Sequence, residues 1–164
     1  MKTQIHITRE DLIKITAIME GMALTDGRSQ RWLALLEREL DRANVVESHE
    51  IPREIITLHS RVCLREVDND ERVIYKLVLP SEANSSEGKL SVLAPIGIAM
   101  LGYGEGDEFE CETPGGTRRF WVERVLFQPE AESLARKSLS QASDTRGKLH
   151  PDQATVEIPQ PALP

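Results

Sequence analysis

The spacing of the hydrophobic residues changes near residue 60, and this change constrains the fold more than any other feature. Before it, apolar residues recur at steps of three and four, which places them on one face of a helix. After it, apolar and polar residues alternate, as in a strand with one buried face. The sequence therefore predicts an α+β chain in which helices precede a small sheet.

The first helical stripe begins after Thr8, which is placed to cap a helix that starts at Arg9. Asp11 stands three residues after the cap, where a capping box has its acid. The residues that form this stripe are Leu12, Ile15, Met19 and Met22. Gly21 weakens the end of the helix.

A turn signal at residues 25–27 precedes Ser29, which can cap a second helix. The second stripe consists of Leu33, Leu36, Leu40 and Ala43. Two such stripes joined by a short turn predict an antiparallel helical hairpin, a short coiled coil, over residues 1–46. Each helix would span about 24 Å. Charges of both signs occupy its outer side, which is interpreted as a solvated face: Glu37, Arg38, Glu39, Asp41 and Arg42.

Residues 47–58 are expected to form a linker, since Pro52 disfavours helix at the residue before it. Residues 59–128 then predict a small antiparallel sheet packed on one short helix. The expected elements are a β-hairpin over residues 62–79, a strand at 89–93, a helix from Pro95 to a stop at Gly102, and strands at 108–112 and 117–127.

The last segment, residues 129–164, contains five of the nine prolines together with many polar residues. This composition predicts a flexible tail. No run approaches the ~20 apolar residues of a membrane span, and the first residues lack the apolar core of a secretory signal. A soluble, cytoplasmic protein is therefore expected. Cys63 and Cys111, without CxxC spacing, are interpreted as two buried thiols.

Catalytic motifs are absent from the sequence. No GxxxxGK[ST] loop occurs, and Gly104-Glu105-Gly106 precedes a strand whose acids would repel phosphate. The four histidines lack metal-ligand spacing: His6, His49, His59 and His150. We expect no catalytic residue, cofactor or metal site, although a carboxylate pair assembled by the fold stays open. A net charge of −7 argues against broad binding to nucleic acid and favours a protein partner with a basic surface.

Several motifs in order resemble the C-terminal domain of the GreA/GreB family. They are residues 88–102 (GKLSVLAPIGIAMLG), Gly106-Asp107-Glu108, Thr113-Pro114-Gly115-Gly116 and, at the first strand, Ser60-Arg61-Val62. This resemblance covers about residues 59–128. The short hairpin and residues 39–43, 54–57 and 128–131 are similar to the Rnk branch of that family, which extends the resemblance to residues 8–132.

The resemblance implies an FKBP-like sheet domain that docks on bacterial RNA polymerase near the rim of the secondary channel. By position, the docking residues would be Ser91, Leu93, Ala94, Pro95, Ile96 and Gly97. Gre factors typically have Ser before the proline, where this chain has Ala94. The competing interpretation is structural, with Pro95 as a helix starter and Ile96 as a core residue.

At the hairpin tip, Gre factors place two acids that hold a catalytic Mg²⁺. The corresponding tip here comprises Leu24, Thr25, Asp26 and Arg28, with one acid and an opposing cation. The resemblance thus implies a non-enzymatic, monomeric regulator that competes with Gre factors without inducing RNA cleavage and influences nucleoside diphosphate kinase levels. No sequence-specific DNA binding and no membrane contact are expected.

Two alternatives belong to other functional classes. The FKBP-like fold also occurs in prolyl isomerases, but their pockets are lined by aromatic residues, which make up 4% of this chain. The aromatic residues of the expected domain are Tyr75, Tyr103, Phe109, Phe120, Trp121 and Phe127. In the other alternative, an exposed Trp32 makes the hairpin a dimerisation element or a chaperone-like clamp.

Overall fold

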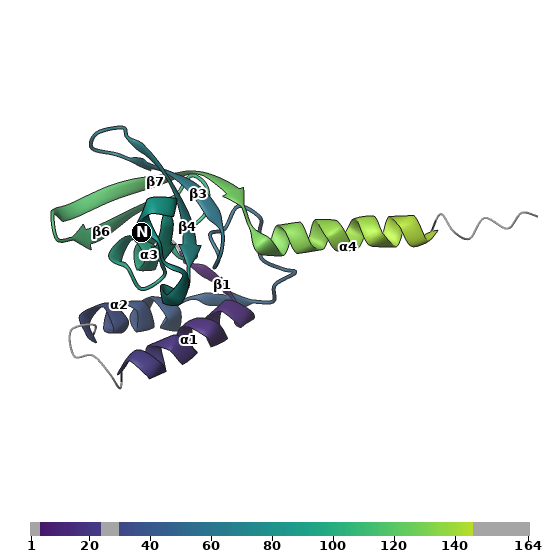
Figure 1. Ribbon diagram of the computed structural model, residues 1–164, viewed down its shortest axis with the longest axis horizontal. Helices are drawn as coiled ribbons and strands as arrows, with labels where there is room; N and C mark the ends of the chain where they lie inside the picture. Colours follow the sequence, from purple (N-terminus) through teal and green to yellow (C-terminus); the bar gives the residue numbers. More distant parts are fainter. Residues whose placement is uncertain (1–3, 24–29, 146–164) are drawn as a thin grey trace, which may run out of the picture.

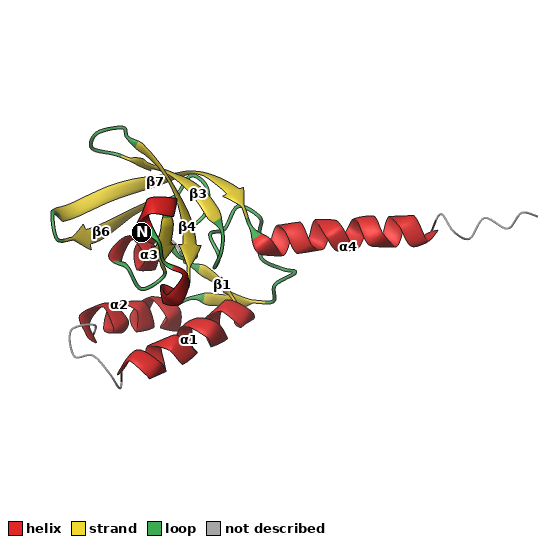
Figure 2. Cartoon of the chain, in the orientation of Figure 1, coloured by secondary structure: helices red, strands yellow, loops and turns green. Residues whose placement is uncertain are grey.

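The structure is a computed structural model that describes residues 4–23 and 30–145. Its strands are β1 (His6–Thr8), β2 (Asn44–Val46), β3 (Arg61–Glu66), β4 (Arg72–Val78), β5 (Lys89–Ser91), β6 (Glu108–Thr113) and β7 (Gly116–Phe127). Its α-helices are α1 (Arg9–Ala23), α2 (Gln30–Asp41), α3 (Pro95–Met100) and α4 (Pro129–Thr145). Figures 1 and 2 show the α1–α2 hairpin against one end of a curled sheet, which confirms the α+β fold.

The main sheet has five strands in the order β5-β4-β3-β7-β6, with β3 at its centre. All its neighbours pair antiparallel except β5, which runs parallel to β4. The predicted alternation is confirmed in β3, where Val62 and Leu64 are fully buried while Arg61 is exposed. Helix α3 covers the inner face of the sheet and contributes Ile98 and Met100 to the core.

The hairpin helices use the stripes that the sequence predicted. Ile15 of α1 and Leu33, Leu36 and Leu40 of α2 are buried. Ile15, Leu36 and Leu40 belong to the same hydrophobic cluster as the inner face of the sheet. The hairpin and the sheet therefore share one core, and burial of this common apolar surface stabilises both.

A two-stranded parallel pairing of β1 and β2, which the sequence did not predict, ties the two ends of the hairpin together. The pair is joined to the sheet domain at Gly102, whose carbonyl accepts a hydrogen bond from the His6 N–H at 3.1 Å. Gly102 has φ +79°, and a Cβ there would lie 2.7 Å from the His6 carbonyl oxygen. Only glycine fits this crossing without strain.

Two expectations about exposure are corrected. Glu39 was placed on the solvated face of the hairpin, but it is only 9% exposed and accepts a hydrogen bond from Arg42 Nε at 2.8 Å. The reason is that α2 packs against α3, which covers this side of the helix. Of the two thiols, Cys111 is buried as predicted, and this burial raises its pKa to about 11. Cys63 is only partly buried.

The predicted linker, residues 47–58, contains no helix or named strand, but it is packed rather than free. Ile51, Ile56 and Leu58 are buried. The Gln128 side-chain amide donates hydrogen bonds to the carbonyls of Pro52 and Ile55, both at 2.8 Å. The connection thus forms part of the core and holds the end of β7.

The tail prediction is wrong for its first half, because Pro129 starts helix α4, which projects from the rest of the molecule (Figure 1). Proline is favoured in the first turn, and the acids Glu130 and Glu132 suit the positive end of the helix dipole. Residues 146–164 lie outside the described residues. Among the helices that the structure describes, none has the length and apolar character needed to cross a membrane.

Asp11 joins α1 to the connection formed by residues 47–58. Thr8 Oγ1 accepts a hydrogen bond from the Asp11 N–H at 3.1 Å, which confirms the predicted cap. The Asp11 carboxylate, however, accepts from the Leu58 N–H at 2.8 Å in place of closing a capping box. Asp11 is 3% exposed, and burial raises its pKa to about 6, helped by nearby Glu130 and opposed by the Leu58 hydrogen bond.

This buried acid predicts a specific pH dependence. Between about pH 4 and pH 6, Asp11 keeps its proton in the folded chain but has lost it in the unfolded chain. The contribution of Asp11 to stability therefore falls as the pH rises through that window. The loss is at most about 3 kcal/mol. Asp11→Asn keeps an oxygen acceptor for Leu58 without the charge. We expect the variant to be more stable than the parent at pH 7.5, by about 1–3 kcal/mol in urea unfolding.

The matched control is Asp41→Asn, which removes an exposed acid at the end of α2 and should not reproduce the gain in stability at pH 7.5. Equal pH dependence in the parent chain and in Asp11→Asn would contradict the assignment to Asp11.

Candidate functional site

The six predicted docking residues run from Ser91, the last residue of β5, through the loop to Gly97 in the first turn of α3. The loop begins at a fixed point, because Val92 is fully buried and its N–H donates to the Val78 carbonyl at 2.8 Å. Ser91 then closes the turn. Its hydroxyl accepts from the Leu93 N–H at 3.1 Å, and its carbonyl accepts from the Ala94 N–H at 3.0 Å. The loop is therefore ordered by its own hydrogen bonds.

Gly97 allows α3 to approach this loop. A Cβ at Gly97 would overlap with the carbonyl oxygen of Ser91 and lie 3.0 Å from its carbonyl carbon. Both neighbours are backbone atoms, which cannot move aside as a flexible side chain can. The sequence placed Gly97 in the docking set through the resemblance alone, and the structure adds a packing reason for the glycine.

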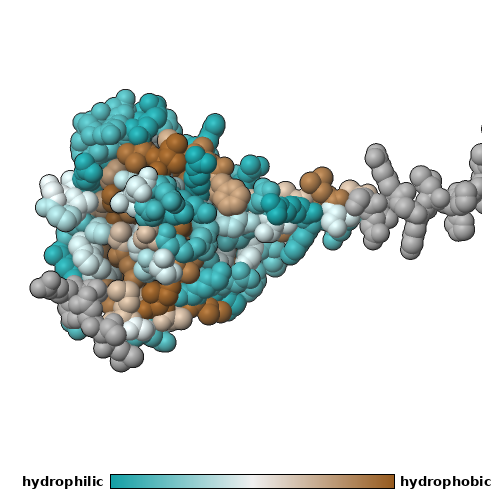
Figure 3. Space-filling model, viewed as in Figure 1, coloured by the Kyte–Doolittle hydropathy of each residue, from teal (hydrophilic) through white to brown (hydrophobic). Residues whose placement is uncertain are grey.

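Four of the six residues form a continuous, half-buried surface: Leu93, Ala94, Pro95 and Ile96. All four are partly exposed. Leu93 and Ile96 also pack against the main hydrophobic cluster, whereas Ala94 ends the loop and Pro95 starts the helix. Ile96 therefore has a packing role, while part of its side chain stays exposed. In the space-filling view, hydrophobic side chains gather in a band across this face of the molecule (Figure 3). Such a surface can bind an apolar partner but offers no acid, base or nucleophile.

Ala94 is the N-cap of α3, with φ −70° and ψ 151°, and its side chain makes no capping hydrogen bond. Pro95 occupies the first helical position. The backbone is thus already arranged for a capping side chain, and a hydroxyl at position 94 would find helix N–H groups to accept from.

The second predicted set lies at the hairpin tip. Leu24, Thr25, Asp26 and Arg28 are outside the described residues, so their role stays a prediction. Of the helices that lead to the tip, α1 has 15 residues and α2 has 12, which correspond to about 22 Å and 18 Å.

A hollow of about 310 Å³ lies between α1, the connection and α4, and no sequence pattern predicted it. Its charged lining has both signs and includes Asp11, Glu130, Lys14 and Lys137. Glu130 accepts a hydrogen bond from Thr57 Oγ1 at 2.7 Å. The hollow exists because α4 is a helix, which the tail prediction missed. In residues 4–23 and 30–145, no three His, Cys, Asp or Glu side chains cluster closely enough to hold a metal ion.

Of the four histidines, His150 lies outside the described residues, and His49 and His59 both line the hollow. His59 is close to an acid, with 2.8 Å between its Nε2 and Glu82 Oε2, and this hydrogen bond lowers the pKa of Glu82. His59 also has φ +66°, in a turn that places its N–H 2.6 Å from the Leu77 carbonyl. These contacts give His59 a structural role at the start of β3.

Comparison with known proteins relates both halves of the chain to described families. A family model of the GreA/GreB transcription elongation factor C-terminal region matches residues 51–126, and one of the Rnk N-terminus matches residues 3–46. The chain is 39% identical over 97 residues to the regulator of nucleoside diphosphate kinase of Escherichia coli K12, covering 58% of this chain and 71% of that protein.

Further relatives are elongation factors. The chain is 35% identical over 114 residues to transcription elongation factor GreA of Syntrophus aciditrophicus, covering 70% of this chain and 68% of that one. A solved structure of a GreA/GreB elongation factor from Nitrosomonas europaea superposes with a TM-score of 0.60 at 35% identity, covering 76% of this chain and all of that one. The chain therefore belongs to the GreA/GreB family and, by both its halves, to the Rnk type within it.

Proposed function

We propose that this chain is a non-enzymatic transcription regulator that binds RNA polymerase at the rim of the secondary channel through the β5–α3 loop. There it competes with Gre factors without inducing RNA cleavage, and it influences nucleoside diphosphate kinase levels. The observation that carries the proposal is the ordered apolar surface at Leu93–Ile96, held by the close approach of Gly97 to Ser91. The names of the relatives, elongation factors and a regulator of nucleoside diphosphate kinase, support the class of function.

The absence of cleavage is proposed from the hairpin. The two helices have only 15 and 12 residues and pack against the sheet domain, and the segment that joins them contains the single acid Asp26 beside Arg28. Holding a Mg²⁺ ion usually needs more than one carboxylate ligand from the protein or its partner. The chain thus retains the docking loop and lacks a pair of acids at the tip.

The two alternatives receive less support. Phe109 and Phe120 are buried and stack with ring centroids 5.7 Å apart, so they build the core and do not line an isomerase pocket. Trp32 is partly buried against the main cluster, with the Arg31 guanidinium 5.7 Å from its ring centroid. It therefore offers little of the exposed apolar surface that a clamp would need.

Competition with a Gre factor tests the proposal. The purified chain should retain core RNA polymerase in a pull-down, and excess GreA should release it, because both proteins would occupy the same docking surface. Stalled elongation complexes should show no transcript shortening when the chain is added, whereas GreA should shorten the transcript in parallel. Failure to bind polymerase, or binding that GreA does not displace, would contradict the proposal.

Restoring the hydroxyl at the docking loop gives a second test. Ala94→Ser should add an N-cap hydrogen bond to α3 worth about 1 kcal/mol, which raises Tm by about 3 °C. If the hydroxyl also contacts polymerase, affinity in a quantitative pull-down should rise about fivefold, the effect of one hydrogen bond. The control Ala34→Ser changes an exposed position of α2 and should not alter affinity. A higher Tm with unchanged or weaker binding would place the polymerase contact elsewhere.

A further inference from the structure

The outer face of the sheet, opposite to α3, carries a group of cations at one end. On β3, Arg61 stands directly across from Lys76 of β4 and from Phe127 of β7. Two residues along, Cys63 is paired with Ile74 and with Arg124. We call Arg61, Ile74, Lys76, Arg124 and Phe127 the basic face. Its members come from three neighbouring strands, about 4.8 Å apart.

The cations of the basic face have no ion-pair partner among the residues that the structure describes. Glu82 interacts electrostatically with Lys76, but its carboxylate already accepts a hydrogen bond from His59. Other cations of the same sheet are paired, and one of the acids involved, Glu123, borders the basic face, where it accepts a hydrogen bond from Cys63 Sγ. Arg72 contacts Glu123 at 2.7 Å and Arg119 contacts Asp68 at 2.8 Å.

Arg61 and Lys76 are like charges placed directly across adjacent strands, an arrangement that destabilises a sheet. No described acid forms an ion pair with either side chain, although the chain as a whole has a net charge of −7 and Glu82 interacts with Lys76 at longer range. An external anion would supply the missing partner. The strands thus concentrate positive charge on an otherwise acidic protein.

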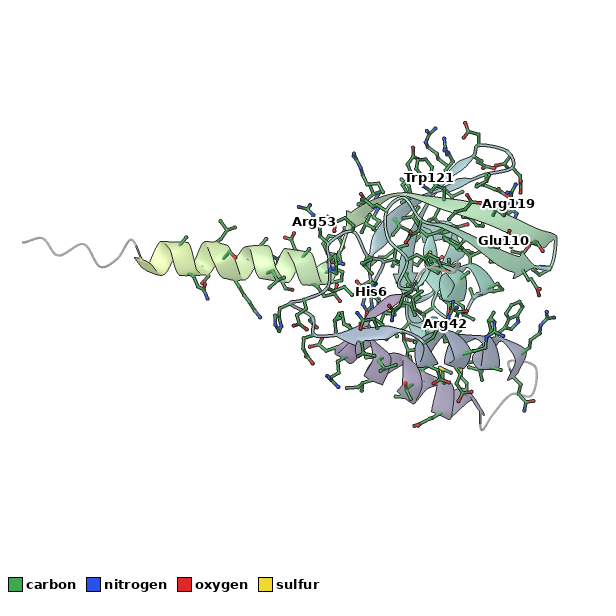
Figure 4. The ribbon with its side chains drawn as sticks, turned by 180° about the vertical axis from the view of Figure 1, so that it is seen from behind. His6, Arg42, Arg53, Glu110, Arg119 and Trp121 are labelled. Carbon is green, nitrogen blue, oxygen red and sulfur yellow. The ribbon has the colours of Figure 1, made fainter. Side chains whose placement is uncertain are left out.

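Apolar side chains lie exposed among these cations. Phe127 is 41% and Ile74 48% exposed, although neither has a polar atom in its side chain. Seen from behind, Arg53 lies near the end of β7, where α4 begins (Figure 4). Trp121, further along β7, is covered by the Arg65 guanidinium at 4.4 Å and is less available.

We propose that the basic face binds single-stranded nucleic acid, with Arg61, Lys76 and Arg124 contacting phosphates and Phe127 stacking on a base. Cations that follow a backbone, together with an exposed aromatic ring, match this kind of ligand. An acidic protein segment would satisfy the charges but would give Phe127 no stacking partner. Because α3 packs on the inner face, both surfaces can be occupied together.

Fluorescence anisotropy of a fluorescein-labelled 12-nucleotide oligouridylate tests the proposal. Binding is measured between roughly 25 and 200 mM salt, because counterion release makes phosphate contacts salt-dependent. The variant is Arg61→Gln with Lys76→Gln and Arg124→Gln. It should bind about tenfold more weakly at low salt, and the slope of log affinity against log salt should fall by about 2, since each lost contact removes ~0.7.

The control carries the same change in net charge, through Arg31→Gln, Arg72→Gln and Arg119→Gln, which remove exposed cations that already have partners. It should keep nearly the parent's affinity, and Tm measurements should show that both variants fold. A conservative Phe127→Leu, which keeps an apolar side chain without a π-face, should weaken binding about fivefold.

Three results would overturn the proposal. They are no binding by the parent chain at the lowest salt, equal losses in the two triple variants, and displacement of the oligonucleotide by polyglutamate at equal charge concentration. The last result would assign the basic face to acidic protein segments.

Discussion

The crossing of backbones at Gly102 holds the two halves of this chain together. Its carbonyl accepts from His6 of β1, and its N–H donates to Ile56 of the connection at 3.0 Å. With φ +79° and no room for a Cβ, the position joins the hairpin, the connection and the end of α3 at one point. The hydrophobic core is continuous across this junction, so the position of the hairpin relative to α3 is determined by packing.

This arrangement separates two kinds of surface. The inner face of the sheet is closed by α3, and the loop before α3 presents the apolar residues Leu93 and Ile96. The outer face keeps its charges in solvent, with the basic face at one end and paired cations elsewhere. An apolar docking surface gives affinity through burial, whereas a basic surface attracts anions over a longer range. The two proposed partners, RNA polymerase and single-stranded nucleic acid, therefore bind different sides of the molecule.

The sequence predicted those elements whose signal is local and periodic. The stripes around Ile15 and Leu36, the alternation at Val62 and Leu64, and the cap at Thr8 are all confirmed. The three-residue strands β1 and β2 were missed because their pairing joins positions far apart in sequence and leaves no periodic pattern. Helix α4 was missed because its polar composition was judged together with the proline-rich residues beyond it, although Pro129 and Glu130 are favourable starting residues.

The same distinction applies to the candidate site. Sequence similarity selected Ser91 and residues 93–97, but the turn made by Ser91 and the lack of space at Gly97 are visible only in the three-dimensional structure. The burial of Glu39 and the hydrogen bond from Leu58 to Asp11 depend on neighbours from other elements. Such long-range contacts determine whether a polar residue faces solvent, and the charge pattern of a single helix does not contain them.

The docking surface can be tested most directly by site-specific photo-crosslinking to core RNA polymerase. A benzophenone side chain at position 93, on the loop before α3, should crosslink to polymerase residues that border the secondary channel, and GreA should suppress the product. The same group at position 13, where Ile13 is exposed on α1, provides the comparison. Crosslinks from position 93 to another part of the polymerase, or stronger crosslinks from position 13 alone, would contradict docking through this loop.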